Sequence, residues 1–400
     1  MGRHFDDDDD DAEYEKNSKK KKTKKIIICV LILVIVLLVV LIGVVIGAIV
    51  GYAEYQCSKL DSSTPDVLSS VAGDANFPNY PITNVEKLNI ILPAIRDSWL
   101  YITAEDRNDI KLHVERRASR ADVISNFGQD FQIVTASKTL DLNFQYSGDI
   151  NGYLNILLGC PQYHINIYVP NNLTFSEITI DSLNANYVIT GVTAGKIAMT
   201  TGAGKLKASK FNVTDIEATT QKGHIELYSG TSSGAITAMV TTIGNVKLGD
   251  LTVASVVGKT LGSGRVYADV VTGDAIDLYC STGVIMTDKV SMTSDAATLK
   301  LTVGSGSITV DRMGKGSVNA ATQTTGDITF QLLNTWVGTL DLSTKSGAIK
   351  KVTGFVNGTS VTETDKTMTG SINTCNSCSS RAKATATKGD IFIKIHQVSA

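Results

Sequence analysis

The stretch that decides the fold is residues 304–330, which read GSGSITVDRMGKGSVNAATQTTGDITF. It contains one short unit three times, a glycine, any residue and then Ile or Val, beginning at Gly306, Gly316 and Gly326. The first and third copies lie 20 residues apart, and the second falls midway between them. Working outward, glycines of this unit form a series along the chain: 204, 223, 244, 264, 283, 306, 326, 347, 370 and 389. Each interval in the series measures between 19 and 23 residues.

The residues after these glycines alternate in polarity, which is typical of strands with one buried face. Inward positions predicted in this way are Ile225/Leu227, Ile236/Ala238/Val240, Ile276/Leu278/Cys280, Ile328/Phe330/Leu332 and Leu340/Leu342. A fixed period near 20 with short strands predicts an all-β fold, a parallel β-helix or β-solenoid of roughly 20-residue coils. Stacked coils would pile apolar side chains in columns about 4.8 Å apart, with glycines at the corners. A plain β-sandwich is less favoured, because its spacing lacks the doubled register.

Composition changes along the chain and predicts its organisation. All six prolines lie before residue 171, whereas 25 of the 34 glycines lie after it. Proline cannot donate to a ladder between coils, so its absence fits a solenoid in the second half. We expect a disordered cytoplasmic tail at 1–25, a transmembrane helix at 26–50, a stalk at 51–76, an N-terminal β segment at 77–170 and solenoid repeats at 171–398.

Residues 26–50 are uncharged and dominated by Ile, Val and Leu, long enough to span a bilayer core of about 30 Å. The lysines on the upstream flank predict that the N-terminus is cytoplasmic and the C-terminal domain extracellular or luminal: Lys19, Lys20, Lys21, Lys22, Lys24 and Lys25. This is a type II single-pass anchor of the plasma membrane or a secretory-pathway membrane. A cleaved signal peptide is the alternative, although its apolar run is usually shorter. Gly43, Gly47 and Gly51 share one helical face and suggest a homodimer through this helix.

The chain carries 37 Lys+Arg and 39 Asp+Glu, a net charge of −2. This balance excludes a globally basic nucleic-acid binder, and we expect no nucleic-acid partner. The bilayer is the predicted partner of the anchor, and a glycan, cell wall or surface protein is the predicted partner of the outer region.

Specific motifs resemble the putative adhesin family, cell-surface domains of unknown ligand found in bacteria and fungi. The strand Ile165–Pro170 ends in Val-Pro, the strand Ile178–Ala185 follows, and then come units such as Thr325-Gly-Asp-Ile328 and Lys345-Ser-Gly-Ala-Ile349. The resemblance covers about residues 80–395. It implies surface interaction and transfers no site residues, because these motifs mark architecture. The family's acidic Ser-Gly-Asp-Ile turn is diluted here by other residues.

Modification sites are predicted beyond the anchor. Sequons predict N-glycosylation at Asn172, Asn212 and Asn357. Cys375 and Cys378 are candidates for a local disulfide, and Cys280 shares the inward parity of Leu278, which predicts a buried thiol.

Catalytic patterns are scarce. Asp269, Asp274 and Asp277 come closest to the carboxylate cluster of a polysaccharide-active enzyme, but one acid per coil is more typical of a solvating edge. No metal or cofactor motif stands out, and we expect none. The sequence therefore favours a non-enzymatic, membrane-anchored adhesin-like surface protein presenting a β-solenoid. The alternatives are a polysaccharide lyase or hydrolase on a β-helix, and a structural spacer without a ligand.

Overall fold

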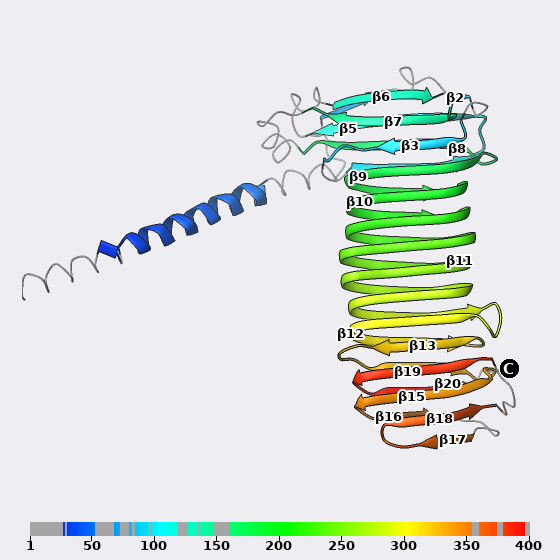
Figure 1. Cartoon of the computed structure of the whole chain (residues 1–400). Helices are drawn as coiled ribbons and strands as arrows, with labels where there is room; N and C mark the ends of the chain where they lie inside the picture. The colour runs from blue at the N-terminus through cyan, green and yellow to red at the C-terminus, as the bar shows by residue number, and fades with distance from the viewer. Residues whose placement is uncertain are drawn as a thin grey trace, which may run out of the picture. The chain divides into compact units, whose positions relative to one another are not determined.

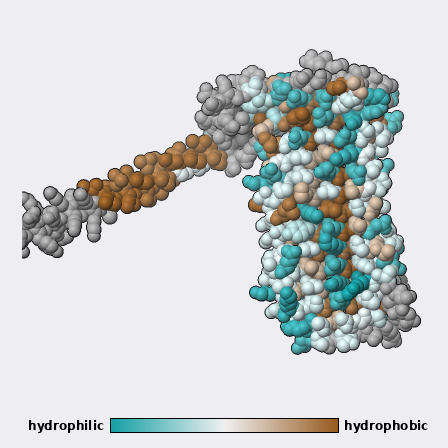
Figure 2. Space-filling model, viewed as in Figure 1, coloured by the Kyte–Doolittle hydropathy of each residue, from teal (hydrophilic) through white to brown (hydrophobic). Residues whose placement is uncertain are grey.

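The computed structural model describes residues 27–28, 30–52, 68–72, 80–81, 85–95, 98–118, 127–134, 136–147, 160–353, 360–373 and 379–396. The chain divides into two compact units, Met1–Pro65 and Asp66–Ala400. The first contains a helix, Val30–Tyr52, which is long and apolar enough to cross a membrane. Its surface is hydrophobic along its whole length (Figure 2). A helix that is apolar all round suits a bilayer, and the same length and composition also suit a signal sequence.

The second unit is a β-solenoid, a stack of parallel coils (Figure 1). Its centre consists of β9 (Thr174–Thr190), β10 (Thr193–Ser209), β11 (Asn212–Met292) and β12 (Thr298–Met313). In β10, Thr193 lies opposite Thr174 of β9 and Asn212 of β11, so each step along the stack is 19 residues there. β11 meets β12 with a step of 23, Ala275 opposite Thr298. The predicted period is therefore the coil length.

The inward columns form one continuous apolar core. Ile225, Leu227 and Ile236 are fully buried, and so are Ile328 and Phe330. All the inward positions predicted from alternation belong to this core, Cys280 included. Most positions in these columns are Ile, Val or Leu, and others are Ala or Met, as in the column of Ile180, Met199 and Ala218. The apolar area that one coil cannot cover is covered by its neighbours.

The corner glycines of successive coils form a ladder, in which each glycine lies very close to the backbone carbonyl of the preceding corner. Gly244 has φ of +150°, and a Cβ there would lie 1.6 Å from the carbonyl oxygen of Gly223. The same clash, with the carbonyl oxygen of the preceding corner, recurs at Gly223, Gly264, Gly283, Gly306 and Gly326. Only glycine allows this close approach, which explains why the unit begins with glycine at every coil.

The C-terminal coils do not stack in chain order. After β13 (Ser317–Thr322) and β14 (Ile328–Leu333), the next coil in space is β19 (Arg381–Lys388) with β20 (Ile391–His396). β15 (Gly338–Ser346) and β16 (Ile349–Thr353) lie beyond it, followed by β18 (Thr367–Ile372) and β17 (Ser360–Glu363) in antiparallel pairing. The order of the coils in space therefore differs from their order in the chain, because a period fixes coil length and not which coils are neighbours. Gly370, in the antiparallel β18, is not a coil corner.

The coils at the N-terminal end also stack in an order that differs from the chain order. β3 (Lys87–Ile91) and β4 (Ser98–Glu105) form a coil directly on β9, and β7 (Thr139–Tyr146) and β8 (Gln162–Pro170) stack outside it. Antiparallel strands follow: β5 (Asp109–Ala118) on β8, β6 (Phe127–Val134) on β7, and β1 (Leu68–Ala72) and β2 (Tyr80–Pro81) on β5. The expected boundary at residue 170 thus falls inside a continuous stack. At both ends, the first or last coil of the chain is enclosed by other coils.

Candidate interaction surfaces of the solenoid

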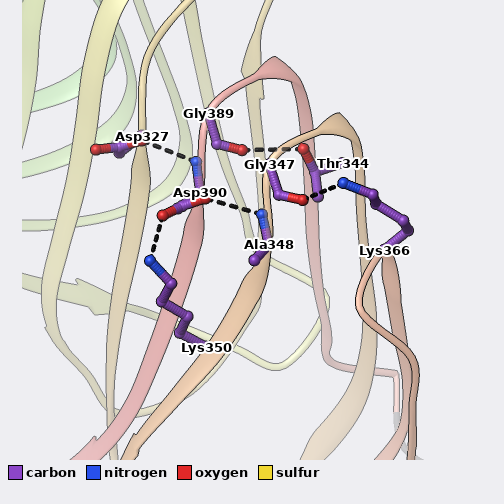
Figure 3. A network of polar contacts seen from close by, with 8 residues as sticks. All are labelled: Asp327, Thr344, Gly347, Ala348, Lys350, Lys366, Gly389 and Asp390. Atoms are coloured by element: carbon purple, nitrogen blue, oxygen red, sulfur yellow. Dashed lines mark hydrogen bonds and ion pairs between the residues drawn. The ribbon is translucent and has the colours of Figure 1, made fainter.

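The residue after each corner glycine can join neighbouring coils through its side chain. Asp327 Oδ1 accepts a hydrogen bond from the backbone N–H of Asp390 at 2.8 Å, and Asp390 Oδ1 accepts one from Ala348 N–H at 2.8 Å (Figure 3). Lys350 donates to the other carboxylate oxygen of Asp390. The hydrogen bonds from Lys350 and Ala348 hold the pKa of Asp390 below its usual value. The main role of these two carboxylates is therefore to link neighbouring coils through hydrogen bonds.

The same corner is closed by further bonds to backbone carbonyls. Thr344 Oγ1 donates to Gly389 O at 2.9 Å, and Lys366 Nζ donates to Gly347 O (Figure 3). The partners come from chain segments about 20 to 45 residues apart, so the network depends on the stacking order. The Gly-Asp-Ile turn is therefore architectural, as its motif indicated.

A surface pocket of about 300 Å³ lies on the strand segments that follow the corner glycines Gly264, Gly283 and Gly306. Its apolar part includes Tyr267 and Met286, and Met286 is 43% exposed. Three carboxylates on successive coils, Asp269, Asp288 and Asp311, lie beside them. The remaining lining residues are Lys247, Ala268, Thr287 and Thr309. We call this set the Tyr267 pocket.

The charges of the Tyr267 pocket are partly balanced. Arg312 forms ion pairs with Asp288 and, at 3.7 Å, with Asp311. The Tyr228 hydroxyl and the nearby carboxylates, that of Asp269 among them, raise the pKa of Lys247. Lys247 Nζ also lies 5.4 Å from the centre of the Tyr228 ring. A bound molecule would meet an aromatic ring with three carboxylates and a cation beside it.

Sequence proximity suggested a different carboxylate cluster. Of Asp269, Asp274 and Asp277, Asp269 alone lines the pocket, and Asp277 forms an ion pair at 3.4 Å with Lys300, which lies opposite it on the adjacent coil. The other carboxylates of the pocket lie on the following coils, Asp288 one coil after Asp269 and Asp311 two coils after it. Asp269, Asp288 and Asp311 each stand five residues after a corner glycine, so counting from the glycines would have found them. Among the described residues, no three Asp, Glu, His or Cys side chains form a group that could hold a metal ion.

The modification sites fall in several places. Asn172, in the turn between β8 and β9, and Asn212, at the start of β11, are exposed, as glycosylation requires. Cys280 is buried with a free thiol, and burial raises its pKa. Cys160 is in a disulfide. Asn357, Cys375, Cys378 and the lysines of 19–25 lie outside the described residues.

The glycines of the apolar helix face open space. Nothing lies within 4 Å of the Cβ position at Gly43, Gly47 or Gly51. Their role in a homodimer therefore stays a prediction.

The comparisons with known proteins agree with this architecture. A family model described as Toastrack DUF4097 matches residues 95–394, three quarters of the chain. The chain belongs to the Toastrack family. The matched range runs from just before β4 to a point inside β20, and so includes the strands that stack out of chain order. No curated protein matches the chain.

Solved structures with similar folds share little sequence with this Toastrack chain. A putative adhesin from Bacteroides fragilis is 12% identical, with a TM-score of 0.35, and the match covers 83% of this chain and 98% of that one. A putative cell adhesion protein from Clostridium sporogenes is 11% identical, with a TM-score of 0.21, and covers 82% and 100%. A putative lipid binding protein from Parabacteroides distasonis is 9% identical, with a TM-score of 0.38, and covers 84% and 98%. TM-scores this low indicate only a distant likeness, and the family is shown by the match over residues 95–394.

Proposed function

We propose that this Toastrack protein is a membrane-anchored, cell-surface adhesin-like protein whose solenoid binds its ligand without catalysis. The apolar helix supports the anchor, and the lysines before it favour a cytoplasmic N-terminus. This orientation would place the solenoid on the extracellular or luminal side of the membrane.

The observation that carries the proposal is the Tyr267 pocket. Its volume of about 300 Å³ suits one or two sugar rings, whose apolar faces pack well on an aromatic ring. Carboxylates beside such a floor accept hydrogen bonds from sugar hydroxyls, and Lys247 can donate one. The ligand class that we propose is therefore a glycan of the cell surface or cell wall.

The same carboxylates are poorly arranged for glycoside cleavage. Hydrolysis uses one carboxylic acid that donates a proton and a second that acts as base or nucleophile. Asp288 and Asp311 both form ion pairs with Arg312, so neither is an unpaired carboxyl group beside the tyrosine ring. This arrangement favours binding over catalysis.

A glycan and cell-wall binding array with the full-length protein in detergent tests the proposal. The Tyr267→Ala variant should lose about 3- to 10-fold in affinity for the glycan that the wild type binds. Tyr279→Ala is the matched control, since Tyr279 also points outward but lies outside the pocket.

Three outcomes would contradict the proposal. Equal losses of glycan affinity in Tyr267→Ala and Tyr279→Ala would show that the pocket does not bind the glycan. Cleavage of a polysaccharide that Asp269→Asn abolishes would make the protein an enzyme. Absence of binding across the array would favour a spacer.

A further inference from the structure

A second groove, of about 580 Å³, lies on the strand segments that precede the corner glycines. It is found where the coil of β19 and β20 stacks on β13 and β14. It is lined by Thr298, Leu299 and Lys300 of β12, Ser317, Val318 and Asn319 of β13, and Ser379, Arg381 and Lys383 at β19. We call it the cationic groove. Residues about 80 positions apart in the chain line it together, so no sequence window contains it.

The register places the charges in order along the groove. Lys300 lies opposite Asn319, and Asn319 lies opposite Lys383 on the next coil. The two lysines are therefore two coil spacings apart, about 10 Å, with a neutral amide between them. A small anion above Asn319 would be within reach of both ammonium groups and of the amide N–H, all of which are donors.

Ion pairs within the protein satisfy this cluster only in part. Lys300 contacts Asp277 at 3.4 Å, with 59% of its side chain exposed, and Arg381 contacts Asp341, with 55% exposed. Lys383 lies opposite Asp341 in the register, but Asp341 pairs with Arg381, and Lys383 itself forms no ion pair among the described residues. Three cations with two carboxylates leave a net positive charge, and exposed pairs of this kind are weak enough to exchange with a ligand.

Hydroxyl and backbone groups organise the floor of the groove. Ser317 Oγ accepts the backbone N–H of Arg381 at 3.0 Å and lies 3.3 Å from Ser379 O, to which it donates. These bonds join β13 to the inserted coil and hold its backbone at Ser379 and Arg381. Thr298 and Asn319 remain as polar groups of the kind that bind sugar hydroxyls.

We propose that the cationic groove binds the acidic groups, carboxylate or sulfate, of an acidic polysaccharide. The groove runs along the stack, so a linear chain could present successive acidic groups to Lys300 and Lys383. The exposure of this face to extracellular glycans rests on the proposed membrane topology, whereas binding itself does not. The site is separate from the Tyr267 pocket, since the two share no residue.

The test uses the full-length protein in neutral phosphatidylcholine nanodiscs and immobilised polygalacturonate, heparin and neutral dextran. We expect the wild type to bind at least one acidic polymer but not dextran, with an affinity that falls as salt rises. The double variant Lys300→Gln/Lys383→Gln should lose on the order of tenfold in affinity. The control Lys207→Gln/Lys222→Gln removes the same charge from outward lysines elsewhere on the stack and should change affinity less than about twofold.

Several results would overturn the inference. They are absence of binding to both acidic polymers, equal losses in the two double variants, or equal binding of a DNA oligonucleotide with the same dependence on Lys300 and Lys383. The last would show a general polyanion surface. Tyr267→Ala should leave binding to the acidic polymers unchanged, so failure of this inference and failure of the proposed glycan pocket are distinguishable.

Discussion

Replacing Gly244 with alanine tests the corner ladder. The new Cβ would lie 1.6 Å from the carbonyl oxygen of Gly223, whereas ordinary van der Waals contact begins at 3.4 Å. The coils must therefore separate locally by roughly 2 Å, which is enough to break the hydrogen bonds on either side of the corner. Two bonds lost at about 1–3 kcal/mol each, plus about 1–2 kcal/mol of strain at positive φ, give a loss of about 3–8 kcal/mol.

Gly314→Ala is the matched control. Its added Cβ would meet Leu333 Cδ1 at an ordinary 3.4 Å, and Gly314 does not have a left-handed φ. We expect its free energy of unfolding to stay within about 1 kcal/mol of the wild type.

The assay is urea denaturation followed by circular dichroism, with hydrogen exchange to locate the damage. In a stack, the loss should appear first as faster amide exchange in the coils that flank Gly244. If Gly244→Ala and Gly314→Ala had the same stability and the same exchange pattern, the reasoning from the corner ladder would be refuted.

Three further predictions concern register, topology and pH. Ile328→Asp should unfold neighbouring coils, at a loss of several kcal/mol, because Ile328 is fully buried. Asp327→Asn keeps the acceptor oxygen and should change thermal stability little. Equal melting temperatures of the two variants would reject the register. If the solenoid is exported, endoglycosidase should raise the gel mobility of the wild type, and less so for Asn172→Gln/Asn212→Gln; an unchanged mobility together with protease protection would reverse the topology. Because the pKa of Asp390 is lowered on folding, its ion pair should stabilise the protein at neutral pH, and this contribution should be lost as the pH falls through the folded-state value, below 3.8. The stability difference between the wild type and Asp390→Asn, measured by denaturation at pH 7 and pH 2, should therefore shrink at the lower pH; a constant difference would contradict this role.

Local patterns in the sequence were sufficient for the coil. The glycine period, the alternation around Ile328 and the inward parity of Cys280 all reflect contacts between equivalent positions of adjacent coils. Such contacts repeat, so they leave a periodic trace in the sequence that reasoning from the residues can find. The apolar helix is equally visible, because its composition has to suit the surroundings of every turn.

The candidate sites were only partly accessible. Each of the three carboxylates of the Tyr267 pocket follows its corner glycine by five residues. The sequence therefore contains the cluster, but a search for acidic residues close together in the chain does not find it. The cationic groove has no such signal. Lys300 and Lys383 are neighbours of one asparagine only because the last coil is inserted beside β13.

The sequence by itself determined the coil length, the inward and outward residues, the glycine corners and the apolar helix, because each depends on short-range or strictly repeating interactions. The tertiary structure alone decided the order of the coils at both ends and the surfaces that this order creates. Any two coils of similar length offer similar ladders to each other, so the period does not distinguish between neighbours. The choice rests on long-range packing and on connections such as the one at Trp336, whose fully buried indole donates to Gly316 O at 3.1 Å.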